Sequence, residues 1–267
     1  MKYIHDHDYH IHSLLSECSS NPRQTPERIL DYAKERGLKR VVITDHFWDE
    51  NVPGASFWYS TYHKFSDISR SLPLPKCEGV EFLFGCECEM DKNGLIGLSP
   101  ERYDEFDFII IPTTHMHMRG FTVDEGDYCN VPRLARLWVQ RLDALLSKDL
   151  PFHKIGIAHL STPCIAVNDG LYVEVIRAIP DSDMYRIFTK AAELGVGIEL
   201  NGSDMRYDKK DEDTLLRPFR IAKECGCKFY YGSDAHKPEE FDVYRYFPRV
   251  IDALGLCEDD KFILKRR

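Results

Sequence analysis

The sequence lacks a long apolar run and an excess of basic residues. No stretch of about 18 apolar residues occurs in the 267 residues, and the first six have no apolar segment, so neither a membrane span nor a signal peptide is expected. The cytoplasm is therefore the expected location. The formal net charge is -9, so bulk charge does not favour binding of a nucleic-acid backbone, which depends on basic side chains that displace counterions.

Linkers and repeats are missing as well. No internal repeat, low-complexity tract or proline-, glycine- and serine-rich segment divides residues 1–267, so we expect a single domain. Nine cysteines form an odd number in a chain without an export signal, which favours reduced thiols over a disulfide framework. The pairs Cys86/Cys88 and Cys225/Cys227 have a spacing that metal ligands use, but they lie in strand-like runs and are interpreted as buried structural thiols.

The sequence does contain short apolar segments that alternate with amphipathic helical segments. This order predicts an α/β fold whose parallel strands are joined by helical crossovers. Seven strands are predicted, at the opening segment up to His12 and at residues 40–43, 81–84, 108–111, 154–157, 196–200 and 228–231. Seven βα units in one domain predict a distorted, TIM-like (β/α)7 barrel with its active site at the carboxyl ends of the strands, and an open doubly wound sheet is the alternative.

Helix caps, breakers and apolar stripes predict four of the helices. One is capped by Thr25 and stopped by Gly37, and the others span about residues 132–148, 184–193 and 213–224. The longer excursions at residues 51–75 and 116–132 are predicted to be loops that cover the site and carry substrate specificity.

Potential metal ligands follow nearly every predicted strand. Because side chains alternate along a strand with a period of two residues, Asp8, His10 and His12 of the first strand are expected on one face. The later strands run into His46, Glu87, His115, His159, Asp234 and His236, and of the eleven histidines only His63 and His153 lie well away from strand ends. Imidazole nitrogen with carboxylate oxygen suits zinc, manganese or iron, and the donors exceed the needs of one ion, so two or three divalent ions are expected. Side chains alternate along a strand, so Glu87 lies on the opposite face from Cys86 and Cys88. We expect the carboxylate of Glu87, and not the thiols, to face the site.

The ordered motifs D-x-H-x-H-S, T-D-H, G-x-E, two isolated strand-end histidines and G-S-D-A-H resemble the polymerase and histidinol phosphatase (PHP) family. The resemblance extends from Asp8 to His236, is nearest to the histidinol-phosphatase-like branch, and implies a distorted seven-stranded barrel with up to three metals. It implies one ion at His10, His12, Glu87 and Asp234, a second at Glu87, His115 and His159, and a third at His46 and His236. Where the family often has a further His or Asp, this sequence has Cys18, so a thiolate ligand that favours zinc and a weak third site are both open.

Neighbouring residues have predicted supporting roles. Asp8 and Asp45 are expected to accept hydrogen bonds from ligand imidazoles and so to orient them. The candidate substrate contacts are Arg119, Arg177, Asn201, Arg206, Lys237 and His117. Among these, an arginine is preferred for phosphate because its planar fork can donate two hydrogen bonds.

The predicted function is hydrolysis of a small phosphomonoester, such as histidinol phosphate, by a hydroxide that bridges two metal ions held by Glu87. A serine nucleophile is not expected, because neither Ser13 nor Ser233 lies in a G-x-S-x-G setting. The alternatives are an amidohydrolase-type metal barrel, a nuclease acting on nucleotides or nucleic-acid ends, and a non-catalytic metal-binding domain.

Overall fold

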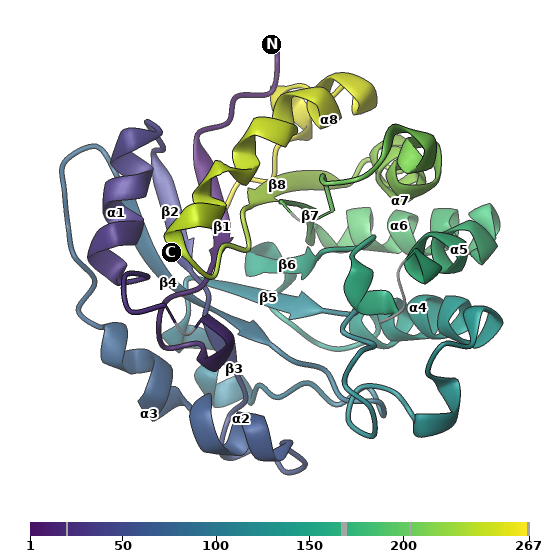
Figure 1. The fold of residues 1–267 in the computed structure, drawn as a ribbon, viewed down its shortest axis with the longest axis horizontal. Coiled ribbons are helices and arrows are strands. Elements are labelled where there is room, and N and C mark those ends of the chain that lie inside the picture. Colours follow the sequence, from purple (N-terminus) through teal and green to yellow (C-terminus); the bar gives the residue numbers. More distant parts are fainter. Residues whose placement is uncertain (20, 167–169, 203, 266–267) are drawn as a thin grey trace.

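The strands form one parallel, nearly closed barrel in the computed structural model, which describes residues 1–19, 21–166, 170–202 and 204–265 (Figure 1). The strands are β1 (His7–Ile11), β2 (Arg40–Ile43), β3 (His46–Phe47), β4 (Glu81–Cys88), β5 (Phe108–Pro112), β6 (Ile155–Ala158), β7 (Gly197–Asn201) and β8 (Lys228–Gly232). They pair in the order β1-β2-β4-β5-β6-β7-β8, and β3 pairs with β4. The predicted α/β barrel is confirmed.

Backbone hydrogen bonds join the first and last strands at the carboxyl end of the barrel. The amide of His12 donates to the carbonyl of Ala235 at 3.1 Å, and the amide of Asp234 donates to the carbonyl of His10 at 2.7 Å. The H-x-H segment at the start of the chain therefore lies beside the D-x-H segment near its end.

The second predicted strand is confirmed as β2, and a further short strand that was not predicted, β3, follows it after a bend. β2 pairs with residues 81–84 of β4, and the pairing resumes as β3, where His46 is opposite Glu87. Between them the Thr44 amide donates to the carbonyl of Ile11 at 2.9 Å, so the chain bends toward β1 before it returns to β4. This bend carries His46 to the same end of the barrel as Glu87.

Helices surround the barrel (Figure 1). They are α1 (Pro26–Glu35), α2 (Phe57–Tyr62), α3 (Phe65–Ile68), α4 (Val131–Leu146), α5 (Leu171–Ala178), α6 (Asp181–Leu194), α7 (Glu212–Glu224) and α8 (Phe247–Leu254). Helices α1, α4, α6 and α7 match the four predicted ones. Helices α2 and α3 lie in a segment that is predicted as a loop, since helices this short show no helical period in the sequence. Within the described residues, none of the helices has the length and apolar character to span a membrane.

An apolar cluster fills the barrel interior away from the site. It contains Tyr9, Val42, Phe108, Ile110, Ala158, Tyr230, Phe262 and Leu264, which come from five strands and the C-terminal segment. A side chain at Gly156 would collide with Tyr230 and Phe108, so glycine is what lets these rings meet across the interior. The remaining, carboxyl-terminal part of the interior is left for polar residues.

All nine cysteines are free thiols. Cys86 and Cys88 pack in the core outside the barrel, and this leaves Glu87, between them, to face the interior. Cys227 is buried as well, while Cys225 is only partly buried.

Arg141 is the polar exception in the apolar stripe of α4, and it is 4% exposed. Its guanidinium lies 3.7 Å from the carboxylate of Glu89. It also donates to four backbone carbonyls at 2.6–3.1 Å, those of Met90, Asp91, Thr113 and Thr122. Arg141 therefore ties the segments that follow β4 and β5 to α4.

We expect Arg141→Met to lower the free energy of unfolding by about 3–5 kcal/mol, because it leaves buried carbonyls and a buried carboxylate without their partner. Urea unfolding measures this change. Arg136→Met, at an exposed position of the same helix, should stay within about 0.5 kcal/mol of the wild type. Equal effects of the two substitutions would contradict the tying role of Arg141.

Candidate metal centre

Histidines and carboxylates from β1, β3, β4 and the segments after β5, β6 and β8 meet at the carboxyl end of the barrel. Within the described part of the chain, three groups have donor atoms that all lie within 4.8 Å of one another. They are His10, His12 and Asp234; Glu87, His115 and His159; and His12, His46 and His236. The structure thus brings together all eight residues that the motifs single out as ligands, and the ligand role itself stays a prediction.

Glu87 lies between these groups, and it is 1% exposed. Its Oε1 is 3.1 Å from Nε2 of His159. Its Oε2 is 2.9 Å from Nδ1 of His46 and 3.4 Å from Nε2 of His12. One carboxylate oxygen faces each side, which is the arrangement that a carboxylate bridging two ions needs.

Five of the imidazoles are oriented through Nδ1, so that Nε2 is left for the centre. The partners of Nδ1, all at 2.7–2.9 Å, are Glu199 for His10, Ser16 for His12, Glu89 for His115, Thr114 for His159 and the carbonyl of Asp234 for His236. A hydrogen bond at one ring nitrogen fixes the tautomer and directs the other nitrogen toward a metal. This pattern fits metal ligands better than core histidines.

Glu199 is a site residue that the sequence reasoning missed. Besides His10, its carboxylate accepts the amide of His159 at 2.8 Å and the side-chain amide of Asn201 at 3.1 Å. A side chain at Gly232 would collide with Glu199 and with His10, so the adjacent strand must carry glycine there. The signal was a glutamate inside the otherwise apolar run of β7.

Asp8 does not have its predicted role as an imidazole acceptor. Its carboxylate instead accepts the amides of His10 and Ser233 at 3.2 and 3.0 Å, and the hydroxyl of Tyr32 at 3.1 Å. The register shifts between Asp8 and Ile11, and such an irregularity reverses the alternation of side chains. Asp8 therefore faces α1, while His10 and His12 face the interior.

Asp45 acts on a ligand histidine through a serine. The hydroxyl of Ser16 donates to Asp45 Oδ1 at 2.7 Å, so Oγ of Ser16 is left to accept from Nδ1 of His12 at 2.9 Å. Asp45 also accepts the amide and hydroxyl of Ser13 at 2.8 and 2.7 Å. The predicted orienting role is thus compatible with the geometry, with Ser16 as a relay.

The charges of the centre favour a bound cation. Burial alone would raise the pKa of Glu87, but His46 and His10 outweigh it and hold that pKa well below its ordinary value. For His12 and His159, burial alone would lower the pKa, but hydrogen bonds to the surrounding carboxylates raise both pKa values to about 9. Ionised carboxylates that attract positive charge to this point, together with nitrogen and oxygen donors, fit a divalent ion.

Cys18 is not part of any of the three donor groups among the described residues. It belongs to the short 3₁₀ turn Glu17–Ser19 and lies at the edge of the cavities above the centre. The third group is instead completed by His12, which also belongs to the first. The geometry therefore gives no support to the thiolate ligand considered for Cys18.

His63, which the sequence places far from any strand end, is buried beside the centre. Its ring lies 5.7 Å from the ring of His46 and 3.9 Å from that of Trp58. Its Nε2 accepts the amide of Glu17 at 3.1 Å, so it connects α2 to the turn that carries Cys18.

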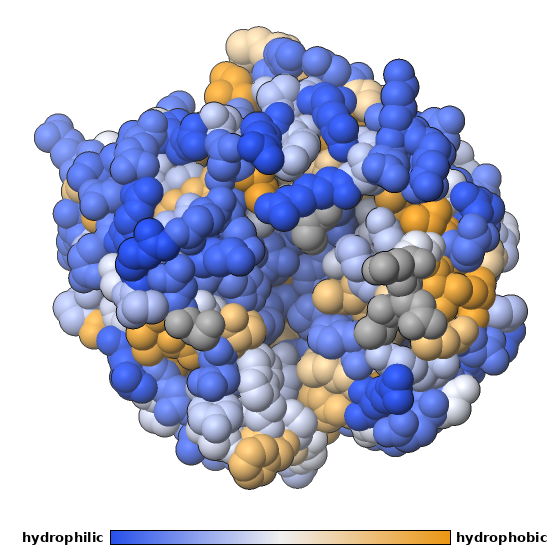
Figure 2. Space-filling model, viewed as in Figure 1, coloured by the Kyte–Doolittle hydropathy of each residue, from blue (hydrophilic) through white to orange (hydrophobic). Residues whose placement is uncertain are grey.

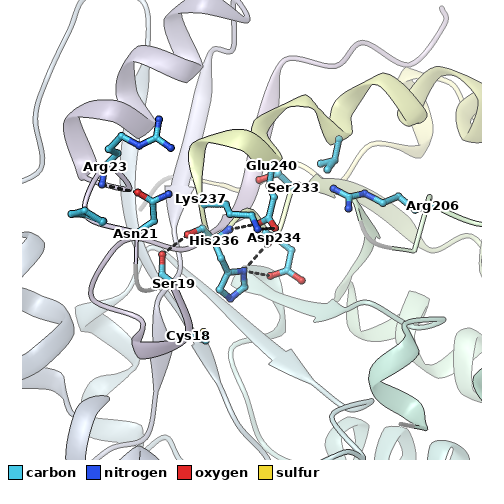
Figure 3. Close-up of a pocket in the computed structure, with 12 residues that line it drawn as sticks. Cys18, Ser19, Asn21, Arg23, Arg206, Ser233, Asp234, His236, Lys237 and Glu240 are labelled. Carbon is cyan, nitrogen blue, oxygen red and sulfur yellow. Dashed lines mark hydrogen bonds and ion pairs between the residues drawn. The ribbon is translucent and has the colours of Figure 1, made fainter. Parts of the chain in front are cut away.

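Two cavities open onto the centre, and the face drawn in Figure 2 is hollowed near its middle. The polar cavity, of about 770 Å³, is lined by Asn21, Arg23, Arg206, Lys237 and Glu240 beside Asp234 and His236 (Figure 3). The aromatic cavity, of about 550 Å³, is lined by Trp58, Tyr59, His117, Met118, Arg119 and Phe121 above His46, Glu87 and His115.

The predicted substrate contacts separate into those that line the cavities and those that do not. Arg119, Arg206, Lys237 and His117 line them. Asn201 is buried and donates to Asp234 Oδ2 at 3.3 Å, so it positions a predicted ligand. Arg177 lies half exposed on α5, where it pairs with Glu174 of the same helix, and a substrate role for it has no support.

We expect Glu199→Gln to weaken metal binding about 10–100-fold, because a neutral amide holds the imidazole of His10 less firmly than a carboxylate does. Competition with a chelator, followed by metal analysis, measures this affinity. Glu193→Gln, at an exposed position of α6, is the control and should bind metal as the wild type does. An unchanged affinity in Glu199→Gln would contradict the orienting role.

Comparison with known proteins agrees with this geometry. The sequence matches the PHP domain over residues 8–203. A protein of Thermoanaerobacter sp. (strain X514) named probable phosphatase is 29% identical over 266 residues, which cover 94% of this chain and 87% of that protein. Another protein named probable phosphatase, from Caldicellulosiruptor saccharolyticus, is 24% identical over 229 residues, with coverage of 85% and 78%.

A solved structure shares the fold. Histidinol phosphate phosphatase from Lactococcus lactis, in complex with zinc, L-histidinol and phosphate, superposes with a TM-score of 0.58 at 17% identity, and the alignment covers 97% of this chain and 98% of that one. At this identity the likeness extends to the fold and no further.

Proposed function

The chain belongs to the PHP domain family, and from that premise we propose that it is a metal-dependent phosphatase that hydrolyses small phosphomonoesters. The observation that carries the proposal is Glu87, whose two oxygens face two groups of imidazoles. The names of the relatives in Thermoanaerobacter and Caldicellulosiruptor support the reaction class. The zinc, L-histidinol and phosphate in the Lactococcus enzyme support a small phosphorylated substrate.

The proposed ligand sets follow the donor groups. His10, His12 and Asp234 with Glu87 would hold one ion, and Glu87, His115 and His159 a second. His46 and His236 would hold a third, with His12 beside them, because Nε2 of His12 has a single lone pair that would serve the first ion. Zinc, manganese and iron all suit such nitrogen and oxygen donors. Divalent ions, when bound, lower the pKa of coordinated water to roughly 7 and neutralise charge that develops on a phosphoryl group.

The chain's own residues supply position and charge. The buried carboxylates and imidazoles are held by hydrogen bonds before any substrate arrives, so little reorganisation is needed during the reaction. Arg206 and Lys237 line the polar cavity beside Asp234 and His236, where they can attract a phosphate dianion (Figure 3). No serine or cysteine nucleophile is needed in this scheme.

The test is phosphate release from a panel of phosphomonoesters that includes histidinol phosphate, with protein of measured metal content. Glu87→Gln should lose at least one ion per chain and lower kcat by about a thousand-fold or more, because the donor shared by two ion sites is weakened. Glu81→Gln is the control: this residue lies on the same strand at the opposite end and pairs with Arg40, so metal content and activity should be kept.

Metal-loaded protein that hydrolyses none of these esters would contradict the proposed function. Cleavage of oligonucleotide ends in the same assay would point to the nuclease alternative, and binding of metal without any turnover to the non-catalytic one.

A further inference from the structure

The two cavities differ in how they meet the metal centre. The aromatic cavity reaches Glu87, His46, His115, Asp234 and His236, which are donors from all three groups. Of the described residues in the donor groups, the polar cavity reaches Asp234 and His236 alone. A phosphate ester whose phosphoryl group lies at the bridging carboxylate therefore has its alcohol part in the aromatic cavity.

Part of the wall of the aromatic cavity is formed by three aromatic rings and a methionine. The ring of Trp58 stands 5.2 Å from that of His46 at an interplanar angle of 66°. The rings of Tyr59 and Phe121 are 5.8 Å apart, and Met118 adds a thioether to the same lining. Aromatic side chains and a thioether that line a cavity pack favourably against an aromatic ligand.

The ring of Tyr59 is held by the same carboxylate that orients His115. The hydroxyl of Tyr59 lies 3.3 Å from Oε2 of Glu89, the same oxygen that accepts from Nδ1 of His115 at 2.7 Å. Tyr59 is 1% exposed, so its ring is fixed between the cavity and the core. The cavity is therefore preformed, which reduces the entropy lost when a rigid group enters it.

The charges of the cavity do not match a cationic alcohol. Among the described residues that line it, the carboxylates are Glu87 and Asp234, and both lie in the donor groups of the centre. Arg119, which is exposed, is the arginine of the lining, and its guanidinium lies 3.5 Å from the centroid of the Tyr128 ring. An ammonium group in this cavity would lose its hydration without gaining a free carboxylate, and the guanidinium would repel it.

Resting on the phosphatase function proposed above, we propose that the substrate is a phosphomonoester of a flat, aromatic alcohol that carries no ammonium group. Trp58 is its principal specificity residue, because it is partly exposed, lines the cavity and meets the ring of His46 edge to face. This substrate class differs from histidinol phosphate, whose alcohol part carries an amine.

The test compares benzyl phosphate, glycerol 3-phosphate and histidinol phosphate, three primary alkyl esters whose leaving groups have similar basicity. Wild-type holoenzyme should show the highest kcat/KM for benzyl phosphate. Trp58→Ala should lower kcat/KM for benzyl phosphate about ten-fold and leave that for glycerol 3-phosphate within about three-fold, because only the aromatic ester packs against the indole.

Phe57→Ala is the matched control, since Phe57 is the neighbouring aromatic of α2 and is 81% exposed. It should leave all three values unchanged. Calorimetry with benzylphosphonate, which resists hydrolysis, gives a second readout: Trp58→Ala should weaken its binding about ten-fold at unchanged metal content, whereas methylphosphonate should bind both proteins equally.

The outcomes separate the two proposals. Hydrolysis that favours histidinol phosphate, or an equal loss on every ester in Trp58→Ala, overturns the aromatic substrate class and leaves the phosphatase function intact. Failure to hydrolyse any of the three esters with metal present overturns the phosphatase function instead.

Discussion

The carboxyl end of the barrel depends on one buried charge, the carboxylate of Glu87. An ionised carboxylate without water costs several kcal/mol unless positive groups and hydrogen bonds surround it. Here the compensation comes from His12 on one side, His159 on the other and His46 on the neighbouring strand. Because these partners belong to different strands, the charge is tolerable only when the sheet has curved into a barrel. The polar centre and the fold therefore require each other.

Around that charge, a layer of hydrogen bonds turns eight separate side chains into one arrangement. Glu199 and Glu89 each hold a histidine by Nδ1, and each is itself held, by Asn201 and by Arg141. The apolar half of the interior has no such demands and is filled by rings that glycine allows to meet. The interior is thus divided along the barrel axis into an apolar, packed half and a half that holds the three donor groups.

The sequence predicted the strands and their polar ends well, because the apolar runs are short and consistent and because motif order specifies which ends carry His, Asp or Glu. It failed where one local event changes the outcome. The irregularity in β1 turns Asp8 away from the site, and the residue propensities of this segment do not predict such an irregularity. Glu199 was missed because one acid in an apolar strand does not show which imidazole it will meet. His63 was misplaced because α2, which brings it to the site, is too short to be periodic.

The backbone hydrogen bonds between the β1 region and the segment after β8 also determine when, during folding, the first donor group can form. His10 and His12 are synthesised before Asp234 and His236, which lie more than 220 residues further along the chain. In that interval the nascent chain carries only part of the first donor group, whose exposed imidazoles can bind ions only weakly. The donors of this group meet only when the segment after β8 docks beside β1, so formation of the group depends on closure of the barrel.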